Sequence, residues 1–247
     1  MTLEQFFKEV PRAALAFSGG TDSALLLWAA KTYGCDARAY YVNTVFQPAF
    51  ELADAQKLAE ELEVPMTVVE ADVLAVPEAA ANGPRRCYYC KRALFTTLWK
   101  RAAEDGYTVL LDGTNASDDA GDRPGMQALR ELEVRSPLRE CGITKDQVRQ
   151  MSKEAGLFTW DKPAYACLAT RVPTGTAITA QMLEKVERGE EALFKLGFTD
   201  FRVRLLGDAA RIQVPEAQME RAAALHKEIT QALSADFSAV LLDLAGR

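Results

Sequence analysis

Alternating strands and helices dominate the first half of the sequence, and this alternation restricts the fold more than any other feature. Apolar runs bounded by turn residues predict strands, and amphipathic stretches predict helices. The predicted strands are 13–17, 37–43, 65–70 and 107–112, and the predicted helices between them start near Asp22 or span 48–62 and 86–104. Strands joined through helices at this spacing form a parallel sheet with helices on both faces. We therefore expect a doubly wound parallel α/β sheet over residues 1–160, with ligands at the carboxyl ends of its strands.

The pattern changes after residue 161. The sequence there predicts a helix over 179–196, two strands around a turn at Gly207, a helix from Pro215 that breaks near His226, and a last strand over 239–244. These elements show no strand–helix–strand repeat. We expect a second, smaller α+β domain over residues 161–247, with the active site between the two domains. Residues 77–84, which contain prolines and a glycine, are predicted to form a loop.

Composition restricts the class of protein. Of the 247 residues, 49% are hydrophobic and 26% are charged, which is typical of a globular chain. The longest apolar run, Ala24 to Ala30, falls short of the roughly 20 residues of a membrane-spanning helix, and the charged N-terminus does not resemble a signal peptide. A net charge of −6 disfavours nucleic acid as a partner. We expect a cytoplasmic protein that acts on a small molecule, with no membrane or nucleic-acid partner.

The sequence contains few of the histidine and cysteine side chains that commonly act in catalysis. His226 is the only histidine, so Ser-His-Asp catalysis and zinc sites with two imidazoles are excluded unless this residue serves. The five cysteines are not expected to form disulfides in a reducing compartment. They remain candidates for metal binding, for catalysis or for plain burial.

The hexapeptide Ser18-Gly19-Gly20-Thr21-Asp22-Ser23 follows the first predicted strand and opens the first predicted helix. Backbone N–H groups and the helix dipole stabilise an anion at such a position, and two glycines allow a phosphate to approach closely. The lysine of a Walker A loop and the G-x-G-x-x-G pattern of a dinucleotide fold are both missing. The hexapeptide predicts a phosphate site of another class, with a tight turn capped by Asp22 as the alternative.

This hexapeptide resembles the PP-loop of the N-type ATP pyrophosphatases. Members of that superfamily cleave ATP between the α and β phosphates and adenylate an oxygen, which a nucleophile then displaces. The resemblance implies a PP-loop sheet of the adenine nucleotide α-hydrolase type and the binding of ATP with Mg²⁺. The residues implied in ATP binding are Ser18, Gly19, Gly20, Asp22 and Ser23.

Further segments resemble the LarE family across nearly the whole chain. They are Arg86 to Lys91, Asp112 to Asp118, Asp122 to Gly125, Arg135 to Leu138, Lys162 to Arg171 and Gly207 to Ile212. LarE proteins are ATP-dependent sulfur transferases that build the nickel-pincer nucleotide cofactor of lactate racemase. The resemblance implies that the carboxylates of pyridinium-3,5-biscarboxylic acid mononucleotide are adenylated and converted to thiocarboxylates, and that the protein is a homo-oligomer. Adenylating a carboxylate needs neutralisation of charge but no general base, because the carboxylate is already ionised. A chain with one histidine can therefore catalyse this reaction.

Three cysteines are candidates for sulfur delivery. Cys87 and Cys90 are three residues apart on a predicted helix, so they share a face, and basic neighbours favour their thiolates. Cys167 lies in a Pro-bounded segment between the predicted domains. Three cysteines suit a 4Fe-4S cluster with one open iron, and buried thiols are the alternative. The LarE resemblance implies either such a cluster or a sacrificial Cys167 that becomes dehydroalanine. Cys35 and Cys141 fit no ligand pattern and are interpreted as structural.

Arginines gather on one face of the predicted hairpin. Alternation along its first strand places Arg202 and Arg204 together, and Arg211 of the returning strand joins them. Three arginines on one face can bind a phosphate or carboxylate, or can form a solvated surface. The LarE resemblance implies that Arg202 and Arg204 bind the substrate phosphate. Glu190 and Glu191, on the preceding predicted helix, face solvent by default, while the resemblance implies acidic residues near the substrate.

The turn after the fourth predicted strand is a second candidate for the nucleotide site. Gly113, Thr114 and Asn115 follow the strand at the expected active edge of the sheet, where they suit contact with a ribose or a phosphate. Asp118 is a candidate ligand of Mg²⁺. A simple Asx turn has the same composition and is the alternative.

Other PP-loop functions compete with sulfur transfer to a small molecule. A tRNA thiolation enzyme also combines a PP-loop with cysteines, but it needs a broad basic surface. An amidating synthetase of the NAD or GMP synthetase type would leave the cysteines idle, so Cys167→Ser would keep full activity. A nucleotide sensor would bind ATP without hydrolysing it.

Overall fold

The computed structural model describes residues 1–118 and 124–247. These residues divide into two compact units. The first unit comprises 1–44, 49–76 and 85–162, and the second comprises 45–48, 77–84 and 163–247. Asp122 and Arg123, which belong to a segment that resembles the LarE family, lie outside the described residues.

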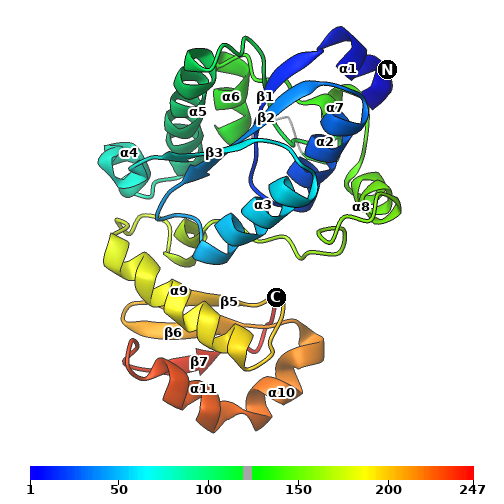
Figure 1. The fold of residues 1–247 in the computed structure, drawn as a ribbon. Helices are drawn as coiled ribbons and strands as arrows, with labels where there is room; N and C mark the ends of the chain where they lie inside the picture. Colours follow the sequence, from blue (N-terminus) through cyan, green and yellow to red (C-terminus); the bar gives the residue numbers. More distant parts are fainter. Residues whose placement is uncertain (119–123) are drawn as a thin grey trace. The chain divides into compact units, whose positions relative to one another are not determined.

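The first unit is built on a parallel sheet (Figure 1). Its strands are β1 (Arg12–Ala16), β2 (Asp36–Asn43), β3 (Met66–Glu70) and β4 (Leu110–Leu111), in the order β3-β2-β1-β4. All three strand pairings are parallel, because a helix returns the chain to the same end of the sheet after each of the first three strands. The predicted α/β class with a parallel sheet is confirmed.

Strand β4 covers two of the six residues predicted for it. The chain is still completing the turn from the preceding helix at Gly106, where φ is +80°. Only Leu110 and Leu111 therefore come into register with Ala14 and Leu15 of β1. Beyond them, the N–H of Asp112 donates to the carbonyl of Arg135 (2.9 Å) on the other side of the strand.

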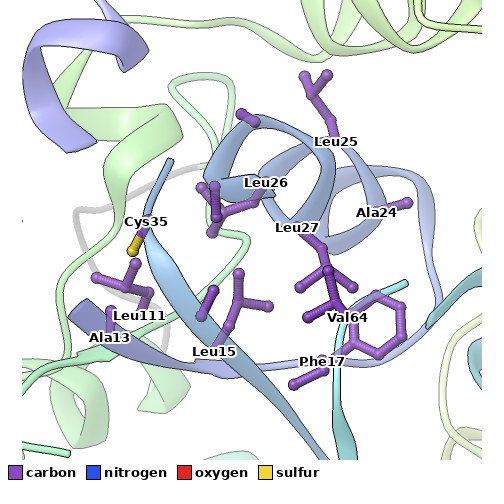
Figure 2. Close-up of a cluster of buried hydrophobic side chains, with 14 of the residues drawn as sticks. Ala13, Leu15, Phe17, Ala24, Leu25, Leu26, Leu27, Cys35, Val64 and Leu111 are labelled. Atoms are coloured by element: carbon purple, nitrogen blue, oxygen red, sulfur yellow. The ribbon is translucent and has the colours of Figure 1, made fainter. Parts of the chain in front are cut away.

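Helices cover both faces of this sheet (Figure 1). They are α1 (Leu3–Glu9), α2 (Thr21–Thr32), α3 (Ala49–Glu61), α5 (Arg86–Glu104), α6 (Pro124–Glu131), α7 (Pro137–Glu140) and α8 (Lys145–Glu154), with a 3-10 turn η1 (Val73–Ala75). Alternate residues of β1 enter different cores. Leu15 packs in one core with Leu26 and Leu27 of α2 (Figure 2), whereas Ala14 packs in the other with Leu98 and Ala102 of α5. Because β1 is buried on both faces of the sheet, its carboxyl end is held in place, and so is the loop that follows it.

The second unit contains a three-stranded sheet and shorter helices. The strands are β5 (Arg202–Leu206), β6 (Ala209–Gln213) and β7 (Val240–Leu242), in the order β5-β6-β7, with β5 and β6 antiparallel and β7 parallel to β6. The helices are α4 (Pro77–Ala80), α9 (Ala180–Lys195), α10 (Met219–Ala224) and α11 (His226–Leu233), with 3-10 turns η2 (Leu168–Arg171) and η3 (Glu216–Gln218).

Two features of this unit bear on the sequence-based expectations. The helix break predicted near His226 is confirmed, because Leu225 separates α10 from α11. The loop predicted over 77–84 instead contains α4, which begins at Pro77, a residue whose fixed φ suits the first turn of a helix. In the described part of the chain, no helix is both long and apolar enough to cross a membrane.

Candidate active site

The predicted phosphate loop lies between β1 and α2, at the carboxyl end of β1. Gly19 has φ +70°, and a Cβ at this residue would lie 3.1 Å from the backbone nitrogen of Ala55 in α3. Both the backbone conformation and the close approach of α3 therefore require glycine. Gly20 is the N-cap of α2 and has no side chain to cap the helix. The first-turn N–H groups of α2 can therefore receive an anion.

Two serines hold the loop in shape. The side-chain oxygens of Ser18 and Ser23 lie 3.2 Å apart, and Ser23 Oγ also donates to the carbonyl of Gly20 (3.1 Å). The N–H of Ser18 donates to Ser23 Oγ (3.3 Å). These bonds close the loop onto the first turn of α2 before any ligand binds.

The turn after β4 packs directly against this loop. A Cβ on Gly113 would lie 2.9 Å from the backbone nitrogen of Ser23. The buried carboxylate of Asp112 fixes the turn, because it accepts hydrogen bonds from Thr114 Oγ1 (2.5 Å) and Ser136 Oγ (2.6 Å). The structure thus brings together the two segments that the sequence predicts at the nucleotide site.

Asp22 joins three elements at this site. Its Oδ1 accepts a hydrogen bond from Asn115 Nδ2 (3.0 Å), and its Oδ2 lies 2.6 Å from Lys145 Nζ, at the start of α8. Both oxygens of the carboxylate are therefore engaged. Sequence analysis missed Lys145, because a lysine at the start of an amphipathic helix is ordinarily a surface residue.

Asp118 closes the turn on which it lies. Its carboxylate accepts a hydrogen bond from the N–H of Asn115 (3.0 Å), and its carbonyl accepts one from Arg139. The Asx turn of the alternative interpretation is made instead by Asn115, whose Oδ1 accepts a hydrogen bond from the N–H of Ser117 (2.8 Å). The role of Asp118 as a magnesium ligand stays a prediction.

The three candidate cysteines are divided between the units. Cys87 is exposed and Cys90 half-buried on α5 in the first unit, and Arg86 Nη2 lies 3.9 Å from Cys87 Sγ. Cys167 is half-buried in the second unit, where it precedes η2. Within residues 1–118 and 124–247, no group of three or more His, Cys, Asp or Glu side chains is placed to hold a metal ion. The shared cluster stays a prediction.

The segment that carries Cys167 is held by a buried ion pair. Arg171 and Glu190 are 1% and 2% exposed, and the guanidinium donates twice to the carboxylate, over 2.7 and 3.1 Å. Arg171 Nη1 also donates to the carbonyl of Ala166 (2.9 Å), next to Cys167. Tyr165 Oη donates to Glu190 as well. The ion pair therefore fixes the backbone on both sides of Cys167.

The default expectation was that both glutamates face solvent. Glu191 is exposed as expected, but Glu190 is buried. In α9, Glu190 lies four residues after Val186 and three residues before Leu193, and both of these residues are fully buried. Helical spacing therefore places Glu190 on the buried face. That spacing is the signal that could have predicted its burial.

The hairpin arginines contact the same segment. Arg202, which is 4% exposed, donates to the carbonyls of Phe201 (2.5 Å) and Ala164 (2.6 Å). Arg204 donates to the carbonyl of Thr170 (2.5 Å). Burial, and then the charge of Arg171, lower the pKa of the Arg202 guanidinium. The structure thus places both arginines beside the backbone that flanks Cys167, and phosphate binding by them stays a prediction.

The two remaining cysteines lie in apolar surroundings. Cys35 is buried and donates to the carbonyl of Val10 (3.4 Å), and burial, followed by the charge of Asp36, raises the pKa of its thiol to about 11. Burial also raises the pKa of Cys141. Both thiols therefore remain protonated at neutral pH, which disfavours a role as nucleophile or metal ligand.

Cys35 is expected to resist alkylation in the folded protein, because the thiolate is the reactive form. Iodoacetamide at pH 8 should modify the exposed Cys87 within minutes and Cys35 only after unfolding in urea. Peptide mass spectrometry with and without urea measures both sites. Equal rates at Cys35 and Cys87 in the native protein would contradict the raised pKa.

Comparison with known proteins places this site in a family. No family model matches the sequence. A protein of unknown function from Synechocystis sp. is 40% identical, over 89% of this chain and 82% of that protein. Pyridinium-3,5-bisthiocarboxylic acid mononucleotide synthase from Lactiplantibacillus plantarum is 35% identical, over 99% of this chain and 90% of the synthase. The chain belongs to the LarE family. Its resemblance to that family, expected from the PP-loop and the cysteine segments, is confirmed.

Membership of the LarE family makes the chain one of a family of enzymes. A tRNA-specific 2-thiouridylase from Clostridium botulinum is a more distant relative, 24% identical over 60% of this chain and 51% of the thiouridylase. This second match relates the LarE-family chain to the wider group of PP-loop enzymes. The site described above is therefore a candidate active site.

Proposed function

We propose that this chain is an ATP-dependent sulfur transferase that converts pyridinium-3,5-biscarboxylic acid mononucleotide into the bisthiocarboxylic acid, a step in building the nickel-pincer cofactor of lactate racemase. The observation that carries the proposal is the match to the Lactiplantibacillus synthase over 99% of the chain. The geometry of the PP-loop supports it. We place the reaction in the cytoplasm, because that compartment supplies ATP and keeps cysteine thiols reduced.

In the first half-reaction, a substrate carboxylate oxygen attacks the α-phosphorus of ATP. The bond from the α-phosphorus to the bridging oxygen breaks, and the electron pair leaves with pyrophosphate. No general base is needed, because the carboxylate is ionised at neutral pH. The N–H groups of the loop over Ser18, Gly19 and Gly20, the first turn of α2 with Ser23, and the turn 113–115 would bind ATP and its magnesium ion. The carboxylates of Asp22 and Asp118 would be the nearby candidates for binding that magnesium ion.

In the second half-reaction, sulfur displaces AMP from the activated carboxylate. The hydrogen bonds around Ala166 and Thr170 hold Cys167 in a defined backbone conformation, which supports its use as a sulfur carrier. In the sacrificial route, Cys167 Sγ attacks the acyl carbon and AMP leaves. The Cα proton of Cys167 is then lost to solvent, its electron pair forms the Cα–Cβ double bond, and the Cβ–Sγ bond breaks with its electrons on sulfur, which gives a thiocarboxylate and dehydroalanine.

A 4Fe-4S cluster is the second route for sulfur. The exposed Cys87 and half-buried Cys90 share one face of α5 and fit two of the ligand positions. When bound by these residues and Cys167, such a cluster would supply sulfide from an iron without a protein ligand. Arg202 and Arg204, which flank the Cys167 segment, are our candidates for the substrate phosphate in either route.

The test is the product analysis of purified protein with ATP, Mg²⁺ and the pyridinium substrate. We expect AMP, pyrophosphate and thiocarboxylate. Cys167→Ser is expected to abolish thiocarboxylate formation and to retain pyrophosphate release, because sulfur transfer follows adenylation. ADP and phosphate as products, or full sulfur transfer by Cys167→Ser, would overturn the proposal. An amidating synthetase would instead form an amide and no thiocarboxylate, and Cys167→Ser would leave that activity intact.

The same preparation separates the two sulfur routes. Anaerobic protein with a cluster should be brown, lose iron on Cys87→Ser and turn over more than once with added sulfide. Colourless protein in which Cys87→Ser stays active, and in which Cys167 loses the mass of hydrogen sulfide after one turnover, would establish the sacrificial route. Cys35→Ser is the matched control, because Cys35 is buried away from solvent.

A further inference from the structure

We infer that Asn82 is a positioning residue that holds the turn 172–176 as one wall of a small cavity, and that it thereby sets the affinity for the phosphate of the substrate. This inference rests on the proposed function and deepens it, because it names a residue that shapes the phosphate site. All the contacts that carry it lie in the second unit, which contains both 77–84 and 163–247.

Asn82 is a buried amide on a backbone of unusual conformation. The residue is 0% exposed, and its φ of +54° lies in the left-handed region. Glycine, aspartate and asparagine adopt this region most readily, and of these three residue types only asparagine carries side-chain N–H donors. A position that needs both a left-handed backbone and a side-chain donor therefore favours asparagine.

The side chain of Asn82 binds three carbonyl groups of one turn. Its Nδ2 lies 3.3 Å from the carbonyl oxygen of Val172, 2.9 Å from that of Pro173 and 3.1 Å from that of Thr176. Because all three neighbours are acceptors, the amide group that faces them is the NH2. The backbone carbonyl of Asn82 also accepts a hydrogen bond from the N–H of Gly175 (2.9 Å). Both the side chain and the backbone of Asn82 therefore fix this turn.

The same turn forms one wall of a cavity of about 150 Å³. Thr174 of the turn and Thr170 line this cavity together with Arg204 and Arg211 of the β5–β6 hairpin. The volume is below the roughly 300 Å³ of pockets that enclose a whole small molecule, so the cavity suits a single group such as a phosphate. The two arginines are held opposite each other by the register of β5 and β6. The width of the cavity therefore depends on where Asn82 holds the turn.

The charges around the cavity favour an anion. Burial, followed by the positive charges of Arg171 and Arg211, lowers the pKa of the Arg204 guanidinium. Arg171 is paired with Glu190, and Arg211 Nε lies 3.7 Å from Asp243 Oδ2. Among these side chains, the guanidinium groups outnumber the carboxylates. A phosphate bound in the cavity would balance the remaining positive charge.

The test compares the proposed mononucleotide substrate with its nucleoside, which lacks only the phosphate. Asn82→Gly removes the amide and still permits the left-handed backbone, and Asn82→Asp keeps the shape of the side chain but replaces its donors by an acceptor. Isothermal titration of the full chain without ATP should show mononucleotide affinity lowered about 10-fold in both variants, as for loss of one hydrogen bond to a charged group. Nucleoside affinity should be unchanged.

Gln218→Ala is the matched control. The amide of Gln218 also joins two segments of the second unit, because its Nε2 donates to the carbonyl of Thr199 (2.7 Å), but within the described residues it is not part of the cavity wall. This variant should change neither affinity. A double variant tests the route of the effect. If Asn82 acts through the cavity, Asn82→Gly should lower mononucleotide affinity no further in a chain that already carries Arg204→Gln.

Equal weakening of mononucleotide and nucleoside binding, or an additive loss in the double variant, would show that Asn82 only supports the fold. Unchanged mononucleotide affinity, or a wild-type protein that binds both ligands equally, would also overturn the inference. Urea unfolding confirms that each variant is folded. Because the titration needs no turnover, it separates this inference from the proposed function. Wild-type protein that prefers the mononucleotide but forms no AMP would contradict only the function.

Discussion

Replacing Glu190 by Ala is expected to lower the free energy of unfolding of the second unit by about 3–5 kcal/mol, the cost of leaving one member of a buried ion pair unpaired. The partner, Arg171, is 1% exposed, so water cannot replace the two hydrogen bonds that its guanidinium makes to the carboxylate. The N–H of Val203 in β5 would also lose its acceptor, Glu190 Oε1 at 2.9 Å. The penalty therefore combines an unpaired charge with an unsatisfied backbone donor.

The adjacent residue provides the control. Glu191 lies on the same helix and forms a 2.7 Å ion pair with Lys195, but its side chain is 60% exposed. Glu191→Ala is expected to cost less than about 1 kcal/mol, because water screens this pair. Urea unfolding of the full chain, followed by circular dichroism, measures both variants. Equal shifts for the two variants would contradict the burial of the Arg171–Glu190 pair.

Replacing Gly113 by Ala is expected to lower kcat/KM for ATP by about 100-fold. This is the loss of rate expected when reacting groups are displaced by about 1 Å. The new Cβ would lie 2.9 Å from the nitrogen of Ser23 and 3.2 Å from its Cα. These are backbone atoms of the PP-loop helix, so the contact cannot be relieved by a side-chain rotation. The first turn of α2 has to move away from the turn after β4.

Gly83→Ala is the control for this prediction, because a Cβ on Gly83 would have no neighbour within 4 Å. It should keep wild-type activity. Pyrophosphate release at varied ATP concentrations measures both variants, and urea unfolding confirms that both are folded. If Gly113→Ala kept wild-type kcat/KM, the turn after β4 would have no part in shaping the nucleotide site.

The main elements of the fold follow from local patterns. Helix α5 has the bounds predicted from amphipathic spacing, and the predicted strand 37–43 corresponds to β2. These elements are predictable because the apolar period and the turn residues are properties of neighbouring residues in the chain. The short segments 45–48 and 77–84, which belong to the second unit, carry too few residues to show such a period.

The sequence by itself determined the PP-loop and its place after the first strand. The whole hexapeptide 18–23, in its place between an apolar strand and a helix, carried that prediction, and the steric demands on Gly19 show why its residue type is restricted. It also determined the family, because several short segments along the whole chain carry the resemblance. Neither conclusion needed a contact between distant residues.

Only the tertiary structure decided the partners of the charged residues. Asp22 and Lys145 are far apart in the sequence, and their 2.6 Å contact exists because α2 and α8 pack on the same side of the sheet. The sequence placed Arg202 on one hairpin face with two other arginines, as an anion site or a solvated surface, and the structure buries it against the backbone carbonyl of Ala164, near Cys167. A charged side chain has no periodic signal of its own, and its role depends on which distant groups burial brings within hydrogen-bonding distance.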